Sequence, residues 1–363
     1  MITKGCVAKA ACDVSRGTGL AILRGRRGAA PSMQAILSVT IPFFALVLCG
    51  YLAARARLLP ESAIPGLNAY VLFFALPCML FRFGASMPLA RLFDPALMAL
   101  WAVVALVMVG TVVATTWGRH GAHGVSLKDA AFGAFVSAFP NTGFMGIPLL
   151  AALLGEAATG PVMVTLIVDL FMTSTLCLVL AQAADGPKRA DGSRAPWWMA
   201  ALRALRGAAT NTQPWAIAAG AIAGVIGLSL PGPIAQVVRM LGDSASPVAL
   251  FTIGAVLWRA GQHAHTRTPL VRYVPIALAK LLAHPLLIGA AGFGARALGA
   301  PISNLGLTTL VLTAALPSAS GVSLLAERFG ADNGRVARVI MTSTALAFVT
   351  FSLLAWALAE RHD

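Results

Sequence analysis

Ser137–Leu150 reads S-A-F-P-N-T-G-F-M-G-I-P-L-L, and this stretch lies in the middle of an apolar segment of about residues 129–154. Pro140 interrupts the segment, because proline lacks an N–H donor and clashes with the preceding helical turn. Inside a bilayer, a broken helix is stable only where the freed backbone groups find partners or line a cavity in the protein. The stretch therefore predicts a discontinuous transmembrane helix built around a site.

A second interrupted segment occurs late in the chain. Ala314–Leu324 reads A-A-L-P-S-A-S-G-V-S-L and places Pro317 near the middle of an apolar segment of about residues 304–329. Two interrupted spans in corresponding positions of two halves point to the binding site of a secondary transporter. Proline kinks without a ligand are the alternative, since prolines are common in transmembrane helices. Small polar residues follow both prolines, and this favours a site.

The composition indicates an integral membrane protein built of helices. Of the 363 residues, 58% are hydrophobic and 11% are charged, whereas soluble domains carry about 25% charged residues. The net charge is +14, but the basic residues lie between the apolar spans, which argues against a nucleic-acid partner. The cysteines and histidines show no metal-ligand spacing. We expect no metal and no cofactor.

Ten spans are found with an apolar window of about 20 residues. The longest polar connection divides them five and five, and an odd number of spans per half forces the halves into opposite orientations. The predicted fold is thus an all-α polytopic membrane protein, a 5+5 inverted repeat whose broken fourth and ninth helices cross. The spans are about 34–54, 63–83, 96–118, 129–154, 159–183, 214–230, 236–258, 273–297, 304–329 and 336–358.

The chain organisation follows from these spans. We expect a basic tail at residues 1–32 that is disordered or not native, a first five-helix repeat at 33–183, a cytoplasmic connection at 184–211 and a second repeat at 212–363. Loops after the odd-numbered spans hold 15 Lys and Arg, against five on the opposite side. Cytoplasmic loops carry such an excess, which predicts a multi-pass protein of the cell inner membrane.

Internal similarity between the halves is weak. Leu-Pro links the first pair of spans at Pro60, with Pro77 inside the second span, and the sixth and seventh spans repeat this at Pro231 and Pro247. The sequence Met-Thr-Ser-Thr occurs at 172–175 and 341–344, but its distance from the interrupting proline differs between the halves. We interpret that second match as chance.

The interrupted spans are the predicted binding site. After each proline a new half-helix begins, with unpaired N–H groups and the positive end of the helix dipole, which together bind anions. The side chains beside the prolines add donors, and glycine allows close approach. The predicted substrate-binding residues are Pro140, Asn141, Thr142, Gly143, Pro317, Ser318, Ser320 and Lys280.

Charged residues inside spans are candidates for function by default. Asp169 lies in the fifth span, and Lys280 lies in the eighth with His284 one turn further. Lys280 is predicted to neutralise a bound anion or to pair with Asp169, and Asp169 to carry a coupling ion; a purely structural ion pair is the alternative. Asp243 is a second coupling candidate. Arg82 lies at a span end, where snorkelling to the interface explains it.

Enzyme motifs are absent from the sequence. It contains no G-x-S-x-G, no H-E-x-x-H and no Walker loop with its lysine, so neither a hydrolase nor an ATP-driven pump is expected.

The motifs resemble those of the auxin efflux carrier family. The resemblance covers about residues 33–360 and rests on F-P-N-T-G-F-M-G-I-P from Phe139 to Pro148, on L-G-D-S-A-S-P-V-A-L-F-T-I-G from Leu241 to Gly254, and more loosely on A-L-P-S-A-S-G-V-S from Ala315 to Ser323. It implies transport of small organic anions held at the prolines of the crossed fourth and ninth helices. Bacterial members resemble malate or malonate carriers. The plant members' long central loop is missing, which argues against auxin as substrate.

These observations predict a secondary transporter for a small mono- or dicarboxylate that works by alternating access, with a scaffold part and a crossover part moving against each other. An anion channel or a membrane receptor with the same bundle is the alternative. The expected partners are the carboxylate, the lipid bilayer, a coupling H⁺ or Na⁺ and, in a dimeric assembly, a second copy of the chain.

Overall fold

The computed structural model describes residues 33–88, 92–118, 125–185, 212–263 and 268–359, together with positions 198, 202 and 206. The described part is helical and contains no strand, only two isolated bridges. The predicted tail at 1–32 and nearly all of the predicted connection at 184–211 lie outside the described residues, so the expectations for both stay predictions.

Helices of the first half begin at polar caps or prolines in several places. The Asp94 carboxylate accepts hydrogen bonds from the N–H groups of Ala96 and Leu97, and Pro95 occupies the first helical position, where its missing N–H costs nothing. In chain order the elements are α3 (Met33–Arg55), α4 (Ala63–Tyr70), η1 (Val71–Ala75), α5 (Leu76–Ser86), α7 (Pro95–Thr116), α8 (Leu127–Ala138), η2 (Thr142–Gly146), α9 (Ile147–Leu154), η3 (Glu156–Ala158), α10 (Thr159–Val168), η4 (Asp169–Thr173) and α11 (Ser174–Asp185).

The second half follows the same design. Ser303 caps a helix by accepting from the N–H of Gly306. The elements are α13 (Thr212–Val225), α14 (Gly232–His263), η5 (Leu270–Arg272), α15 (Val274–Leu278), η6 (Ala279–Ala283), α16 (His284–Ala297), α17 (Asn304–Ala314), α18 (Gly321–Arg328) and α19 (Asn333–Ala359).

The ten predicted spans all correspond to helical segments, although their lengths differ. Seven helices in the described residues are long and apolar enough to cross a membrane unaided. The fourth and ninth spans are broken, as predicted, into α8 with α9 and α17 with α18. The sixth is only the 14-residue α13, which ends at Val225 and not near residue 230, because Gly227 takes a positive φ of 65° just beyond it.

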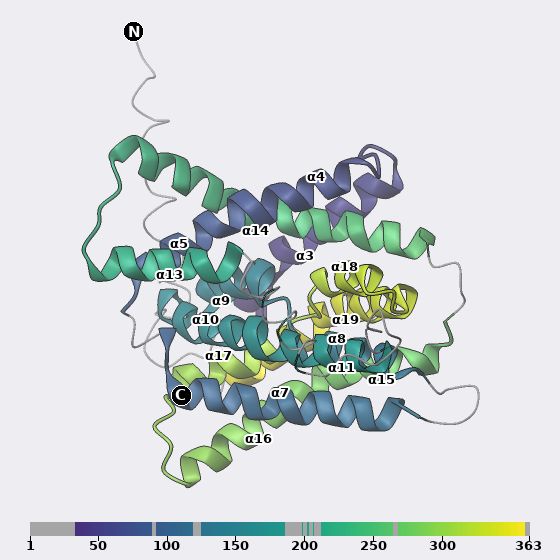
Figure 1. Ribbon diagram of the computed structural model, residues 1–363. Coiled ribbons are helices and arrows are strands. Elements are labelled where there is room, and N and C mark those ends of the chain that lie inside the picture. Colours follow the sequence, from purple (N-terminus) through teal and green to yellow (C-terminus); the bar gives the residue numbers. More distant parts are fainter. Residues whose placement is uncertain are drawn as a thin grey trace.

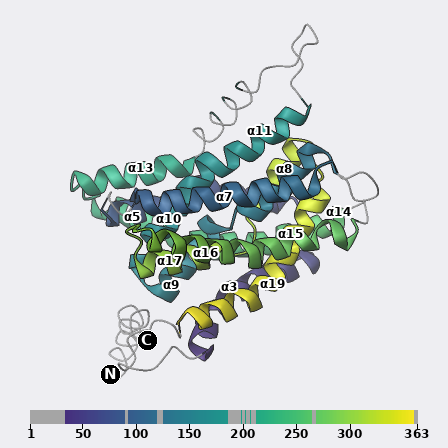
Figure 2. The ribbon, with the colours of Figure 1, turned by 90° about the horizontal axis from the view of Figure 1, so that it is seen from below.

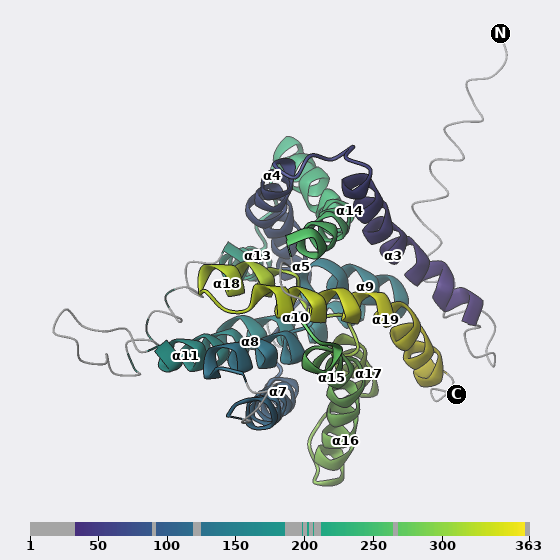
Figure 3. The ribbon, with the colours of Figure 1, turned by 90° about the vertical axis from the view of Figure 1, so that its right-hand side faces the viewer.

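The helices form two groups that combine both halves of the sequence (Figure 1). The scaffold group consists of α3, the continuous run α4–η1–α5, α13 and α14. The crossover group contains the other helices, from α7 to α11 and from α15 to α19. Figure 3 shows the two groups as separate layers, and Figure 2 shows α7 beside α16 within the crossover group.

Glycines bring the scaffold helices together in two similar pairs. In the α3–α14 pair, a Cβ at Gly50 would lie 1.8 Å from the carbonyl oxygen of Phe251, and a Cβ at Gly254 would clash with α3 in return. In the α5–α13 pair, Gly84 and Gly220 play the same reciprocal roles. Gly220 follows Gly50 by 170 positions, and Gly254 follows Gly84 by the same 170. Small residues allow such close helix packing in membranes. An internal repeat would produce this pairing; the inverted orientation of the halves stays a prediction.

Candidate functional site

The two broken helices meet at their breaks. Pro140 and Ser318 form an isolated antiparallel bridge, and the N–H of Asn141 donates to the carbonyl of Pro317 at 2.8 Å. These partners are far apart in sequence, so the bond fixes one break against the other. The two interrupted segments therefore lie against each other at their prolines.

Ser318 serves to hold this crossing together. Its hydroxyl donates to the carbonyl of Val136 at 2.6 Å, and its N–H donates to the Ser343 hydroxyl at 3.2 Å. The neighbouring Ala319 N–H donates to the carbonyl of Phe139 at 3.0 Å. Ser318 is buried, and its hydroxyl is occupied by a backbone carbonyl of α8. In this structure the Ser318 hydroxyl, predicted to bind the substrate, bonds one broken helix to the other.

Each break exposes backbone donors at the start of a half-helix. The N–H groups of Gly143 and Phe144 bond to no carbonyl among the described residues, and neither do those of Ser320 and Gly321. These groups belong to the first turn, where no preceding helical carbonyl is available. Two pairs of N–H groups at the positive ends of the half-helices therefore lie at the crossing.

Side chains at the first break are also without partners. Asn141 is 4% exposed, and its side-chain amide caps no N–H of the half-helix that it precedes and bonds to no other described residue. The hydroxyl of Thr142 is buried and has no partner in the described part of the chain. Buried polar groups are normally hydrogen-bonded, so these two groups point to a ligand or a water at the crossing.

The intramembrane acid has a defined environment. Asp169 is 1% exposed, and its Oδ1 accepts from the Trp101 indole N–H at 2.9 Å and from the Thr173 hydroxyl at 2.9 Å. Its Oδ2 has no partner among the described residues. Asp169 begins η4, a π-helical turn, and such turns are frequent at functional sites.

Lys280, the lysine inside the eighth span, contacts the end of α17 just before the second break. Lys280 is fully buried in the π-helical turn η6, and its ammonium donates to the carbonyl of Ala314, the last residue of α17. It also lies 3.4 Å from Nδ1 of His284. A cation at a helix C-terminus offsets the negative end of the dipole, so Lys280 stabilises the end of the helix that precedes the break.

Asp169 and Lys280 belong to one cluster without forming a direct ion pair. The described contacts of the Lys280 ammonium go to Ala314 and His284, and those of the Asp169 carboxylate go to Trp101 and Thr173. Trp101 links the two, because its ring packs on the His284 ring with centroids 5.1 Å apart. The direct Asp169–Lys280 ion pair, which the sequence analysis gave as the alternative, is thus not the arrangement observed.

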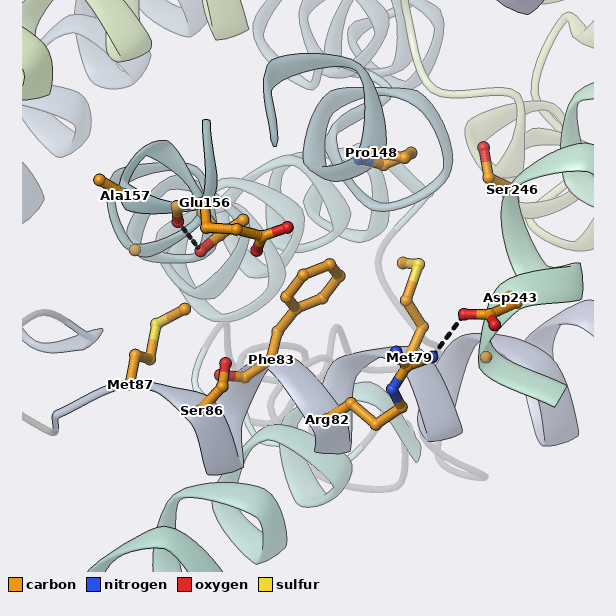
Figure 4. Close-up of a pocket in the computed structure, with 13 residues that line it drawn as sticks. Met79, Arg82, Phe83, Ser86, Met87, Pro148, Glu156, Ala157, Asp243 and Ser246 are labelled. Carbon is orange, nitrogen blue, oxygen red and sulfur yellow. Dashed lines mark hydrogen bonds and ion pairs between the residues drawn. The ribbon is translucent and has the colours of Figure 1, made fainter. Parts of the chain in front are cut away.

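Asp243 lies away from this cluster, at a cavity between the two helix groups (Figure 4). The Asp243 carboxylate pairs with Nη1 of Arg82 at 2.5 Å. The cavity has a volume of about 750 Å³. The sequence analysis explained Arg82 by snorkelling to the interface and did not foresee this ion pair.

Some contributing residues gave little signal in the sequence. Trp101 is an ordinary apolar residue of a span until the fold brings it to Asp169. The two Met-Thr-Ser-Thr copies, interpreted above as a chance match, each supply a contact: Thr173 bonds to Asp169, and Ser343 accepts from Ser318. That repeated motif was the available signal, although its two copies reach different parts of the site.

The fold and the crossing define a class: a multi-pass helical membrane protein with a polar site at two broken helices. Comparison with known sequences agrees with this class. The profile of the family described as "Membrane transport protein" matches residues 35–355. The chain belongs to this family of transporters, and its resemblance to the auxin efflux carriers is confirmed.

Individual relatives extend the comparison. The chain is 28% identical over 328 residues to the "Putative malonate transporter" of Rhizobium meliloti (strain 1021), covering 88% of this chain and 94% of that protein. It is 24% identical over 326 residues to the "Uncharacterized transporter YfdV" of Escherichia coli (strain K12), covering 88% and 96%. A 129-residue match to the "Auxin efflux carrier component 8" of Arabidopsis thaliana is 28% identical and covers 34% of each chain.

Proposed function

We propose that this protein is a secondary transporter that carries a small carboxylate across the cell inner membrane by alternating access. The observation that carries the proposal is the crossing, where N–H groups of two half-helices without a carbonyl partner lie beside the buried side chain of Asn141 and the unpartnered hydroxyl of Thr142. Carboxylates are the natural ligands of such donors.

The roles of the predicted residues differ in this proposal. Asn141 and Thr142 contact the carboxylate directly, together with the N–H groups that follow Pro140 and Pro317. Ser318 braces the crossing, and Lys280 holds the end of α17 in place for the second half-helix. Gly143 and Ser320 are half-buried and lie at the starts of the two half-helices, where their N–H groups belong to the proposed donor set.

Asp169 is the proposed coupling group. It is buried in the crossover group with one carboxylate oxygen unbonded, so it can accept a proton without losing its bonds to Trp101 and Thr173. Charged groups inside the membrane often form proton relays in transporters. We propose H⁺ as the coupling ion, and movement of the crossover group against the scaffold group as the transport step.

Malonate is the first substrate to test, because one relative carries that name. Purified protein is reconstituted into liposomes preloaded with unlabelled malonate, and entry of labelled malonate is followed. A carrier gives saturable uptake and counterflow. Non-saturable flux without counterflow would instead indicate the channel alternative, and binding without flux would indicate the receptor alternative. Succinate, malate and acetate complete the screen.

A further inference from the structure

The cavity at Arg82 lies between the two helix groups and separate from the crossing. One wall comes from α5 and α14 of the scaffold group, and the other from α9, η3 and α10 of the crossover group. Figure 4 shows the Phe83 ring and the Glu156 carboxylate pointing into the space between these walls. The lining residues are Met79, Arg82, Phe83, Ser86, Met87, Pro148, Glu156, Ala157, Thr159, Gly160, Gly242, Asp243 and Ser246.

Arg82 is the one cationic side chain among these lining residues. Its Nη1 donates to the Asp243 carboxylate at 2.5 Å and to the carbonyl of Arg239 at 3.4 Å. Its Nη2 and Nε donate to no described residue. Since a guanidinium offers five donors in a planar fork suited to carboxylates, Arg82 retains donors for a second partner.

The Arg82–Asp243 pair is accessible from the cavity. The side chains of Arg82 and Asp243 are 42% and 64% exposed, and exposed ion pairs contribute little to stability. A carboxylate that enters the cavity can therefore replace Asp243 on the guanidinium. Glu156, on the opposite wall, is acidic and would repel an anion. Among the lining side chains, the attraction of an anion therefore comes from Arg82.

We propose that Arg82 is a carboxylate-binding residue of this cavity. In the empty protein the Asp243 carboxylate occupies the Arg82 guanidinium, and a substrate carboxylate displaces it. This inference rests on the proposed function and adds an entry subsite to it. Pro148 lies on α9, which continues the half-helix that begins at the first break. A carboxylate on Arg82 is thus next to the helix whose start forms the proposed binding site.

The proposal predicts that substitutions of Arg82 and of Asp243 change the dissociation constant for malonate in opposite directions. Arg82→Gln removes the attraction, so the dissociation constant for malonate should rise about tenfold, the value expected for hydrogen bonds to a charged group. Asp243→Asn removes the competitor, so the constant should fall, by roughly threefold. Arg82→Lys keeps the charge without the fork and should lie between Arg82→Gln and wild type.

The experiment is equilibrium binding of labelled malonate to full-length purified variants, with melting temperature recorded for each. Arg239→Gln is the matched control, because it removes the same charge from α14 while Arg239 lies outside the cavity lining; its affinity should equal wild type. If the Arg82→Gln protein does not fold, Asp243→Asn and Arg82→Lys still carry the test.

The outcomes distinguish the Arg82 subsite from the proposed function. Raised affinity in Asp243→Asn with lowered affinity in Arg82→Gln or Arg82→Lys supports the subsite. Lowered affinity in both partners' variants, or no change in any, would overturn it and leave a structural ion pair while the proposed function stands. Absence of malonate and other carboxylate binding in wild type would overturn the proposed function itself, and this subsite with it.

Discussion

The scaffold group and the crossover group are held together by different chemistry. Scaffold helices meet through glycines at main-chain distance, and their buried polar residues among those described are only Thr40 and Thr252. The crossover group contains every buried Asn, Asp, Lys, His and Arg of the described residues: Asn141, Asp169, Lys280, His284 and Arg335. Close apolar packing suits a rigid wall, whereas buried polar groups are costly and mark function. The buried polar groups thus gather in the crossover group, whereas the scaffold group contributes the exposed Arg82–Asp243 pair at the cavity.

The largest expected effect is on scaffold packing. Gly50→Ala places a Cβ 1.8 Å from the Phe251 carbonyl oxygen, which belongs to the main chain and cannot rotate away. Overpacking of this kind costs about 3 kcal/mol or more, so the melting temperature in detergent should fall sharply. Gly66→Ala is the matched control, since its Cβ would meet nothing within 4 Å. Equal stability of the two variants would remove the basis for a glycine-packed scaffold.

The second effect concerns the second break in the crossover group. Pro317→Ala restores an N–H and favours a continuous helix by up to about 3 kcal/mol. The half-helix would then lose several aligned donors at once, so malonate transport should fall strongly in a protein that still folds and inserts. Transport at the wild-type rate in that variant would reduce the breaks to ordinary kinks.

The third effect separates coupling from binding. Asp169→Asn keeps an oxygen that can accept from Trp101 and Thr173, so folding and malonate counterflow should persist. Accumulation driven by a proton gradient should disappear, because the amide cannot take up the proton. Asp243→Asn changes the second coupling candidate, which lies at the cavity, and should retain accumulation whatever its effect on affinity. Gradient-driven accumulation by the Asp169→Asn protein would exclude Asp169 as the coupling group.

The smallest effect tests the unpaired hydroxyl. Thr142→Val replaces a buried hydroxyl without a partner by a methyl group of the same size, which should stabilise the empty protein by about 1 kcal/mol. Affinity for malonate should decline in the same variant. A lower melting temperature in Thr142→Val would show that the hydroxyl already has a partner in the empty protein.

Much of the fold could be predicted from sequence because its main determinants are local. Pro140 and Pro317 break their helices through the chemistry of proline itself, and span length follows from the thickness of a bilayer. The contacts of the site depend on the assembled fold. No residue near Trp101 in the sequence indicates that its indole bonds to Asp169. Arg82 pairs with Asp243, which lies 161 positions later in the chain.

The role of a polar residue was equally hard to predict from its position. Asn141 and Ser318 each follow an interrupting proline, and the sequence assigned both to the ligand. The fold uses the Ser318 hydroxyl for the Val136 carbonyl and leaves the Asn141 amide unbonded among the described residues. The π-helical turns at Asp169 and Lys280 also have no signature in composition or spacing.

The central claim is that the crossing of the broken helices binds the carboxylate, and the most direct test is the dissociation constant of the Asn141→Ala protein for malonate. The claim predicts a rise of about tenfold or more, the value of a hydrogen bond to a charged group, with the melting temperature of the empty protein unchanged. Wild-type affinity in a folded Asn141→Ala protein that binds malonate would contradict the claim.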